Sequence, residues 1–251
     1  MDLGLRDRVY VLTGGSRGLG RATAQALVAD GAKVVISARS EDGVAAAVAE
    51  LGAASAAGLS ADLSSPEAPQ RLIATATESF RRLDGVMISV GGPPGGSMAD
   101  ITDEQWRASF ESVFLGAVRM AVAFGAALGD GSIVFVLSTS VRAPLPALAI
   151  SNGLRPGLAG VAKTLADDLG PKGIRVNALM PGRVATGRVI EIDARMGDPD
   201  AVRAELSQRI PLRRYADPEE FGKVAAFVLS PAAGYVSGAM IPVDGGALRG
   251  I

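Results

Sequence analysis

The chain has 251 residues, a length that suits one α/β unit, and its 25 basic and 26 acidic residues leave a net charge of −1. These charges are interleaved, which argues against a nucleic-acid partner or a polybasic membrane-binding surface. Cysteine and histidine are absent, so disulfides and thiolate or imidazole metal sites are excluded. Positions 1–7 carry charge and no apolar window of about 18 residues is seen, so we expect a cytoplasmic protein without a membrane span that binds a small molecule.

Short β-branched runs alternate with alanine- and leucine-rich stretches of helical period, as in repeated βαβ units. In chain order, strands are predicted at 8–12, 33–37, 57–60, 85–90, 132–137, 175–179 and 240–243. Helices are predicted between them at 18–30, 42–51, 66–82, 102–128, 152–169 and 218–230. The pattern predicts an α/β fold, a single-domain Rossmann fold over residues 1–251 with a doubly wound seven-stranded parallel sheet and helices on both faces.

One segment, 187–210, interrupts this alternation with a weakly patterned, charge-containing stretch. We expect it to form a lid over the ligand cleft. Its acidic residues Glu191 and Asp193 are expected on a solvated face.

A glycine-rich turn, from Thr13 to Gly20, lies between the first apolar strand and the first helix. Glycines allow a tight turn and close approach of the backbone, and the free N–H groups at a helix start attract a pyrophosphate. A glycine loop alone is a weak signal, and an ordinary βα turn is the alternative.

The motif Thr13-Gly-x-x-x-Gly-x-Gly resembles the fingerprint of the short-chain dehydrogenase/reductase family, and in particular its 3-oxoacyl-(acyl-carrier-protein) reductase-like members. Further family landmarks follow in the right order over nearly the whole chain: Asp62-Leu63, Asn177, Pro181-Gly182, Thr186, Pro218-Glu219-Glu220 and Val243-Asp244-Gly245-Gly246. The resemblance implies a dinucleotide cofactor. The residues that it implies for cofactor binding are Gly14, Ser16, Arg17, Gly18, Leu19, Gly20, Arg39, Asp62, Leu63, Val90, Gly91, Arg155, Pro181, Gly182, Val184 and Thr186.

The choice of nucleotide depends on the end of the second strand. An NAD-selective domain usually has an acidic residue there, which bonds the ribose hydroxyls and repels a 2′-phosphate. Positions 36–40 hold no acid but include Arg39, and Arg17 lies in the glycine loop. Two guanidinium groups suit the extra phosphate, which predicts NADP(H). The alternative is two solvated surface arginines.

The catalytic residues that the resemblance implies are only partly present. The family serine is matched by Ser138, but its Tyr-x-x-x-Lys motif is replaced by Ser151-x-x-x-Arg155. The asparagine position of the preceding helix holds Val113, and the family's Asn-Asn-Ala-Gly segment has become 89–92. These changes cluster on one cleft, which favours a divergent branch with a reshaped site.

Proton transfer is therefore in question. A serine hydroxyl such as that of Ser151 is a poor general acid, and Arg155 stays charged, so we expect Arg155 to bond the ribose or to fix a carboxylate or phosphate of the substrate. Tyr10 lies within a strand and Tyr235 in a turn. Of the three tyrosines, only Tyr215 is a candidate for a place at the cleft. The alternative is that Tyr215 lies in an interface.

Three functions stay open. The first is an NADP(H)-dependent oxidoreductase that interconverts carbonyl and hydroxyl groups of a small molecule, with Ser138, Ser151 and Arg155 in the catalytic site. The second is a catalytically weak or inactive NADP(H)-binding sensor or partner subunit, and the third is a non-reductive isomerase or dehydratase on the same fold. The resemblance also implies a homo-oligomer, a dimer or a tetramer.

Overall fold

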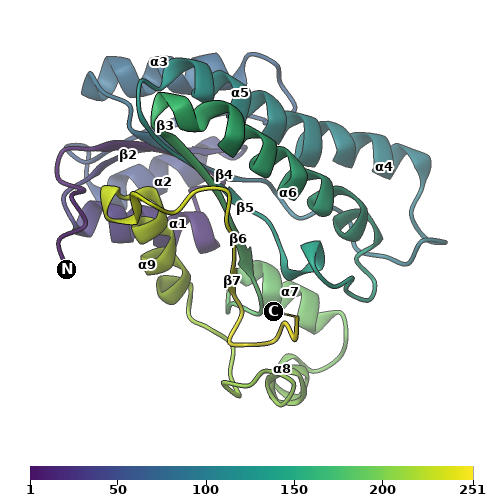
Figure 1. Ribbon diagram of the computed structural model, residues 1–251. Helices are drawn as coiled ribbons and strands as arrows, with labels where there is room; N and C mark the ends of the chain where they lie inside the picture. The colour runs from purple at the N-terminus through teal and green to yellow at the C-terminus, as the bar shows by residue number, and fades with distance from the viewer. Residues whose placement is uncertain (251) are drawn as a thin grey trace.

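The computed structural model describes residues 1–250 and has a seven-stranded sheet in the order β3-β2-β1-β4-β5-β6-β7 (Figure 1). Every neighbouring pair of strands is parallel. This confirms the predicted α/β Rossmann architecture. The strands are β1 (Val9–Thr13), β2 (Lys33–Ala38), β3 (Ala56–Ser60), β4 (Gly85–Ser89), β5 (Gly131–Val136), β6 (Ile174–Pro181) and β7 (Met240–Val243).

Helices cover both faces of the sheet (Figure 1). Successive residues of β1 point to opposite faces, so Val9 and Val11 join one buried core while Tyr10 and Leu12 join the other. The first core lies under α3 (Ala68–Phe80), α5 (Gly116–Ala127) and α6 (Ala149–Leu169), and the second under α1 (Gly18–Ala29), α2 (Glu41–Leu51) and α9 (Pro218–Leu229). Short turns of 3-10 helix occur at Thr139–Val141, Gly170–Lys172 and Pro231–Ala233.

The helix predicted at 102–128 is not regular throughout. It begins as α4 (Asp103–Ser109), widens into a π-helical turn at Phe110–Leu115 and continues as α5. The N–H of Gly116 donates to the carbonyl of Glu111, five residues earlier. A Cβ at Gly116 would lie 2.3 Å from the Leu63 carbonyl oxygen, so the widened turn brings the helix backbone against the segment after β3.

The expectation that no window of about 18 residues is apolar enough for a membrane span is wrong, because by length and composition alone the stretch Asp103–Ala127 could cross a membrane. Such a single candidate is weak evidence, because a core helix of a sheet-covering layer meets the same test. Here Met120, Ala121 and Phe124 of this stretch are fully buried in the core over the sheet. The stretch is therefore accounted for as a packed helix.

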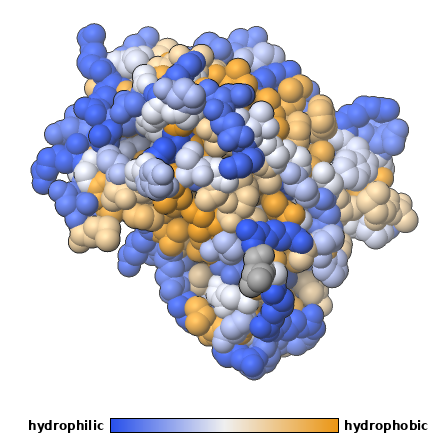
Figure 2. Space-filling model, in the orientation of Figure 1, coloured by the Kyte–Doolittle hydropathy of each residue, from blue (hydrophilic) through white to orange (hydrophobic). Residues whose placement is uncertain are grey.

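The segment 187–210 contains two helices, α7 (Gly187–Ala194) and α8 (Pro199–Ser207), where the sequence indicated weak patterning. Thr186 and Asp198 cap their N-termini through side-chain hydrogen bonds. Together with the loop that follows, they project from the carboxyl end of the sheet (Figure 1), and the surface around α8 is mainly hydrophilic (Figure 2).

The expected solvated position of Asp193 is wrong. Its side chain is 2% exposed, accepts a hydrogen bond of 2.9 Å from the Tyr215 hydroxyl, and is paired with Arg183. Burial and the bond to Asp193 raise the pKa of Tyr215 to about 12. Tyr215 is thus held in a buried contact between α7 and the loop before α9. Glu191 is exposed as expected.

Candidate active site

The expected functional residues gather at the carboxyl edge of the sheet. The strand order runs outward in opposite directions from β1 and β4, and the segments that follow these two strands face each other there. In open α/β sheets, ligands bind outside the carboxyl ends of strands at such a switch point. The Thr13 hydroxyl donates to the Ser89 carbonyl at 3.0 Å and accepts from its N–H at 2.8 Å, which fixes the glycine loop against the end of β4.

The glycine loop has the backbone geometry of a phosphate cradle. Gly14 and Gly18 have φ values of 62° and 55°, a region that side chains disfavour. A Cβ at Gly20 would lie 2.3 Å from the Gly14 carbonyl oxygen. Arg17 is the N-cap of α1 and makes no side-chain capping bond within the described residues. The first N–H groups of α1 are therefore left to an anion, and the loop fits a dinucleotide pyrophosphate.

The residues expected around the adenosine half lie after β2 and β3. Arg39 and Arg17 are both exposed, and the positive charge of Arg39 contributes to lowering the pKa of Asp62. The main cause of that lowered pKa is hydrogen bonding of the Asp62 carboxylate to Ser64. Ser16 is half-buried beside the start of α2. Two exposed guanidinium groups therefore belong to the glycine loop and to the segment after β2, where a 2′-phosphate is expected.

The segment after β6 lies on another side of the glycine loop. A Cβ at Gly18 would come 3.4 Å from the Thr186 methyl group, so Thr186 lies directly beside the glycine loop. Gly182 donates its N–H to the Val243 carbonyl, and a Cβ there would lie 2.7 Å from Asp244. Val184 is buried and forms a bridge with Ala216. Pro181 ends β6, which extends two residues beyond the predicted strand.

Three serines meet at the end of β5. Ser138 is half-buried, and its hydroxyl accepts the N–H of Ser140 at 3.1 Å. The Ser140 hydroxyl is in turn 3.2 Å from that of Ser151, and both side chains are buried. Because α6 begins at Ala149, three residues earlier than predicted, Ser151 lies in its first turn. Sequence comparison with the family motif missed Ser140, although its spacing of two residues from Ser138 was visible.

Arg155 lies deeper than the sequence suggested. Its side chain is 7% exposed, and Nη1 donates to the carbonyls of Val136 and Leu137, each at 3.0 Å. Burial lowers the pKa of Arg155 to about 10. Within residues 1–250 it forms no salt bridge with a carboxylate. The guanidinium thus stabilises the end of β5. From the sequence, a hydrogen bond of Arg155 to the ribose or to a substrate group was expected.

The other altered positions lie in the π-helical turn and in the loop after β4. Val113 is buried in the π-helical turn. Val90 is buried, whereas Gly91 and Gly92 are exposed in the loop that follows β4. The N–H of Gly96 donates to the Ala147 carbonyl, which joins this loop to the segment between β5 and α6.

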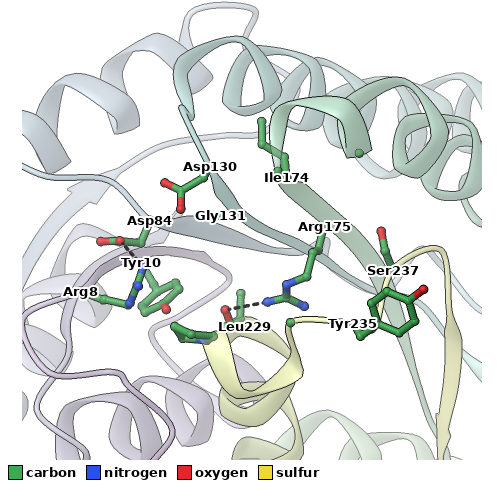
Figure 3. A pocket seen from close by; sticks show the side chains of 14 residues that line it. Arg8, Tyr10, Asp84, Asp130, Gly131, Ile174, Arg175, Leu229, Tyr235 and Ser237 are labelled. Atoms are coloured by element: carbon green, nitrogen blue, oxygen red, sulfur yellow. Dashed lines mark hydrogen bonds and ion pairs between the residues drawn. The ribbon is translucent and has the colours of Figure 1, made fainter.

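A cavity of about 550 Å³ lies at the opposite, amino edge of the sheet (Figure 3). Tyr10 and Arg175 face it, and Tyr235 lies at its rim, fully exposed. Arg175 donates to main-chain carbonyls there, including that of Ser230 at 2.9 Å. Tyr10 and Tyr235 are therefore remote from the glycine loop, as expected from their places in the sequence.

Asp84, also at this edge, is 5% exposed and accepts hydrogen bonds from Arg8, Arg82 and the N–H of Val9. Burial acts to raise the pKa of Asp84, but these bonds outweigh it, so the pKa lies below its usual value. Asp84 thus joins the start of β1 to the start of β4 and belongs to the scaffold.

The fold and the glycine cradle define a Rossmann-type nucleotide-binding protein. A family model described as enoyl-(acyl carrier protein) reductase matches residues 14–247. The short-chain reductase protein NovJ of Streptomyces niveus is 34% identical over 249 residues, which cover 96% of this chain and 94% of NovJ. A 3-oxoacyl-(acyl-carrier-protein) reductase of Synechocystis is 32% identical over 249 residues, covering 96% and 97%. The chain belongs to the short-chain dehydrogenase/reductase family of oxidoreductases.

Solved structures agree with this assignment. L-sorbose reductase from Gluconobacter frateurii, complexed with NADPH and L-sorbose, has a TM-score of 0.94 and 28% identity and covers 100% of both chains. A variant of actinorhodin polyketide ketoreductase with NADPH has a TM-score of 0.91 and 28% identity, covering 97% of this chain and 98% of the other. The expectation of NADP(H) is supported by the cofactor of these two neighbours.

Proposed function

We propose that this protein is an NADP(H)-dependent oxidoreductase that interconverts a carbonyl and a hydroxyl group on a small molecule. The observation that carries the proposal is the glycine cradle at the uncapped start of α1, which lies next to Thr186. Ser138 follows β5 at the same carboxyl edge of the sheet, with β4 between β5 and β1. The bound cofactor would supply or accept the hydride. Gly14, Gly18 and Gly20 would hold its pyrophosphate through close backbone contact.

Arg17 and Arg39 support NADP(H) over NAD(H), since both are exposed and lie beside the glycine loop and the end of β2. The test is a titration of the protein with NADPH and with NADH, in which nicotinamide fluorescence reports binding. Arg39→Asp should weaken the binding of NADPH about 10-fold or more and the binding of NADH much less, because only NADPH has the 2′-phosphate to which the charged hydrogen bond is made. Arg6→Asp, an equal charge change at an exposed position before β1, is the control. Equal losses for both nucleotides in Arg39→Asp would contradict the assignment.

In the chemical step, Ser138 would hydrogen-bond the substrate oxygen. The hydroxyls of Ser140 and Ser151 are hydrogen-bonded to each other. In addition, a serine hydroxyl has a pKa far too high for efficient general acid catalysis. We therefore propose that water or the substrate itself supplies the proton that the carbonyl oxygen gains on reduction. Arg155 would contribute a positive charge behind the end of β5. Residual hydride transfer remains feasible, because loss of a general acid typically costs about 10²- to 10⁴-fold in rate.

The same observations favour a second candidate, an NADP(H)-binding sensor or partner subunit. It is favoured by Arg155, whose Nη1 is occupied by two main-chain carbonyls. Single-turnover oxidation of bound NADPH across a panel of carbonyl compounds separates the two. Tight NADPH binding with no oxidation of any compound would favour the sensor or subunit. A double variant, Ser151→Tyr with Arg155→Lys, should raise the oxidation rate of a weak enzyme.

A family-like homo-oligomer and a lid role for 187–210 complete the proposal. Both are tested directly, the first by sedimentation of the free protein and the second by the protection of this segment from proteolysis when NADPH is added. We also propose a cytoplasmic location, which fractionation of cells checks.

A further inference from the structure

We propose that Arg188 is a substrate-recognition residue that binds the carboxylate or phosphate group of an anionic carbonyl substrate. This inference rests on the proposed function, because it concerns the same cleft. Arg188 is the second residue of α7, two positions after Thr186, and its side chain is half-buried.

The guanidinium of Arg188 lies over the loop that follows β4. Its Nη2 donates to the Pro93 carbonyl at 3.2 Å, and a Cβ at Gly92 would lie 3.1 Å from both Nε and Nη2. Because position 92 is glycine, the guanidinium plane approaches the loop backbone closely. Arg188 thus connects the proposed lid to the loop at the edge of the cleft.

This position is next to the proposed reaction centre. Ser89 of β4 is paired with Val136 of β5, so Gly91 and Ser138, each two residues further on, leave neighbouring strands at the same level. Neighbouring strands lie about 4.8 Å apart. Gly92, against which Arg188 packs, is the next residue of that loop. A substrate oxygen at Ser138 would therefore have the rest of a small molecule within reach of Arg188.

The charge of Arg188 is available to a ligand. It forms no salt bridge with any carboxylate of the described chain, and its one hydrogen bond uses one of the five N–H groups of a guanidinium. The remaining donors form a planar fork that matches a carboxylate or a phosphate. By contrast, Arg183 on the same side of the cleft is paired with Asp193, and Arg155 is buried against carbonyls.

The test uses pairs of carbonyl compounds that differ in charge. Acetoacetate is compared with its methyl ester, and dihydroxyacetone phosphate with dihydroxyacetone, which separates a carboxylate ligand from a phosphate. For wild type, Arg188→Gln and Arg188→Lys, we would measure kcat/KM with NADPH and the NADPH affinity by fluorescence. Arg195→Gln, at an exposed arginine just after α7, is the matched control.

We expect wild type to prefer the anionic member of one pair. Arg188→Gln should lower kcat/KM for that anion about 10- to 100-fold, as expected for the loss of a charged hydrogen bond, and leave its neutral partner and the NADPH affinity within about twofold. Arg188→Lys should retain part of the preference, because it keeps the charge without the fork. Equal losses for both members, or a parallel loss of NADPH affinity, would overturn the inference.

Failure of the proposed function gives a different result. If no compound is oxidising bound NADPH, each is titrated into the NADPH complex and binding is followed by nicotinamide fluorescence. Binding of one anion to wild type, weakened in Arg188→Gln and not in Arg195→Gln, supports the inference even in a protein that is no reductase. Absence of any anion preference in both rate and binding refutes it.

Discussion

Replacement of Gly20 by alanine tests the phosphate cradle most directly. The added Cβ would lie 2.3 Å from the Gly14 carbonyl oxygen and 2.9 Å from the Gly15 Cα. Carbon contacts are normally about 3.5 to 4.0 Å, so the glycine loop must move by about 1 Å. Overpacking of this kind costs about 1 to 3 kcal/mol, of which alanine's better helix propensity offsets about 1 kcal/mol.

The main effect should fall on the nucleotide. A shift of the loop moves the N–H groups at the start of α1 away from the pyrophosphate, and we expect NADPH to bind about 10- to 100-fold more weakly, since each charged hydrogen bond contributes about 1.5 to 3 kcal/mol. The loss of folding stability should stay below about 2 kcal/mol. Urea unfolding gives the stability, and nicotinamide fluorescence gives the affinity.

Gly160→Ala is the matched control. Gly160 is exposed inside α6, and a Cβ there would meet no atom of residues 1–250 within 4 Å. The variant should gain about 0.4 to 1 kcal/mol of stability and bind NADPH as wild type does. A folded Gly20→Ala protein with wild-type NADPH affinity would refute the cradle.

Three further predictions concern the scaffold and the proposed lid. Gly222→Ala should destabilise the fold by about 1 to 3 kcal/mol in urea, because its Cβ would lie 2.5 Å from the Ala22 carbonyl oxygen between α9 and α1; an unchanged midpoint would contradict this close packing. The lowered pKa of Asp84 means that its contribution to stability is complete above the unfolded pKa of about 3.9 and is lost as the pH falls through the lower folded value. Asp84→Asn should therefore unfold more easily at pH 7 and show a shallower loss of stability below about pH 4, which urea titrations across pH check. Tyr215→Phe removes the donor to buried Asp193, so cleavage within 187–210 by a protease should become faster, and an unchanged cleavage rate would show that this bond does not hold the segment.

The sheet was predictable because its signals are local. Buried parallel strands appear as apolar runs, and the glycines of the first turn mark the edge where a nucleotide binds. The wide turn at Phe110–Leu115 was not predictable in this way. It ends where Gly116 closely approaches the Leu63 carbonyl, and these two residues are far apart in the sequence.

The candidate site was predictable in position but not in the direction of its side chains. The motif spacing brought Ser138, Ser151 and Arg155 to the end of β5, but it could not show that Arg155 turns inward to the main-chain carbonyls. A buried charge is placed by its hydrogen-bond partners, and these lie on another element. The importance of Arg188 was hidden for the same reason, because it follows from contact with the loop after β4.

The replaced residues form a mutually satisfied set, and this bears on how the site arose. Ser151 has Ser140 as its hydroxyl partner, and Arg155 has two carbonyls, so both polar side chains are buried with hydrogen bonds. A site that had merely decayed would be expected to leave such groups unpaired, at a cost of about 1 to 3 kcal/mol each. Restoring the family's tyrosine and lysine with Ser151→Tyr and Arg155→Lys alone should therefore lower the stability of the protein, because the Ser140 hydroxyl loses its hydrogen-bond partner. Adding Ser140→Ala should recover stability in urea, and a triple variant less stable than the double would show that the serine pair is not the compensating contact.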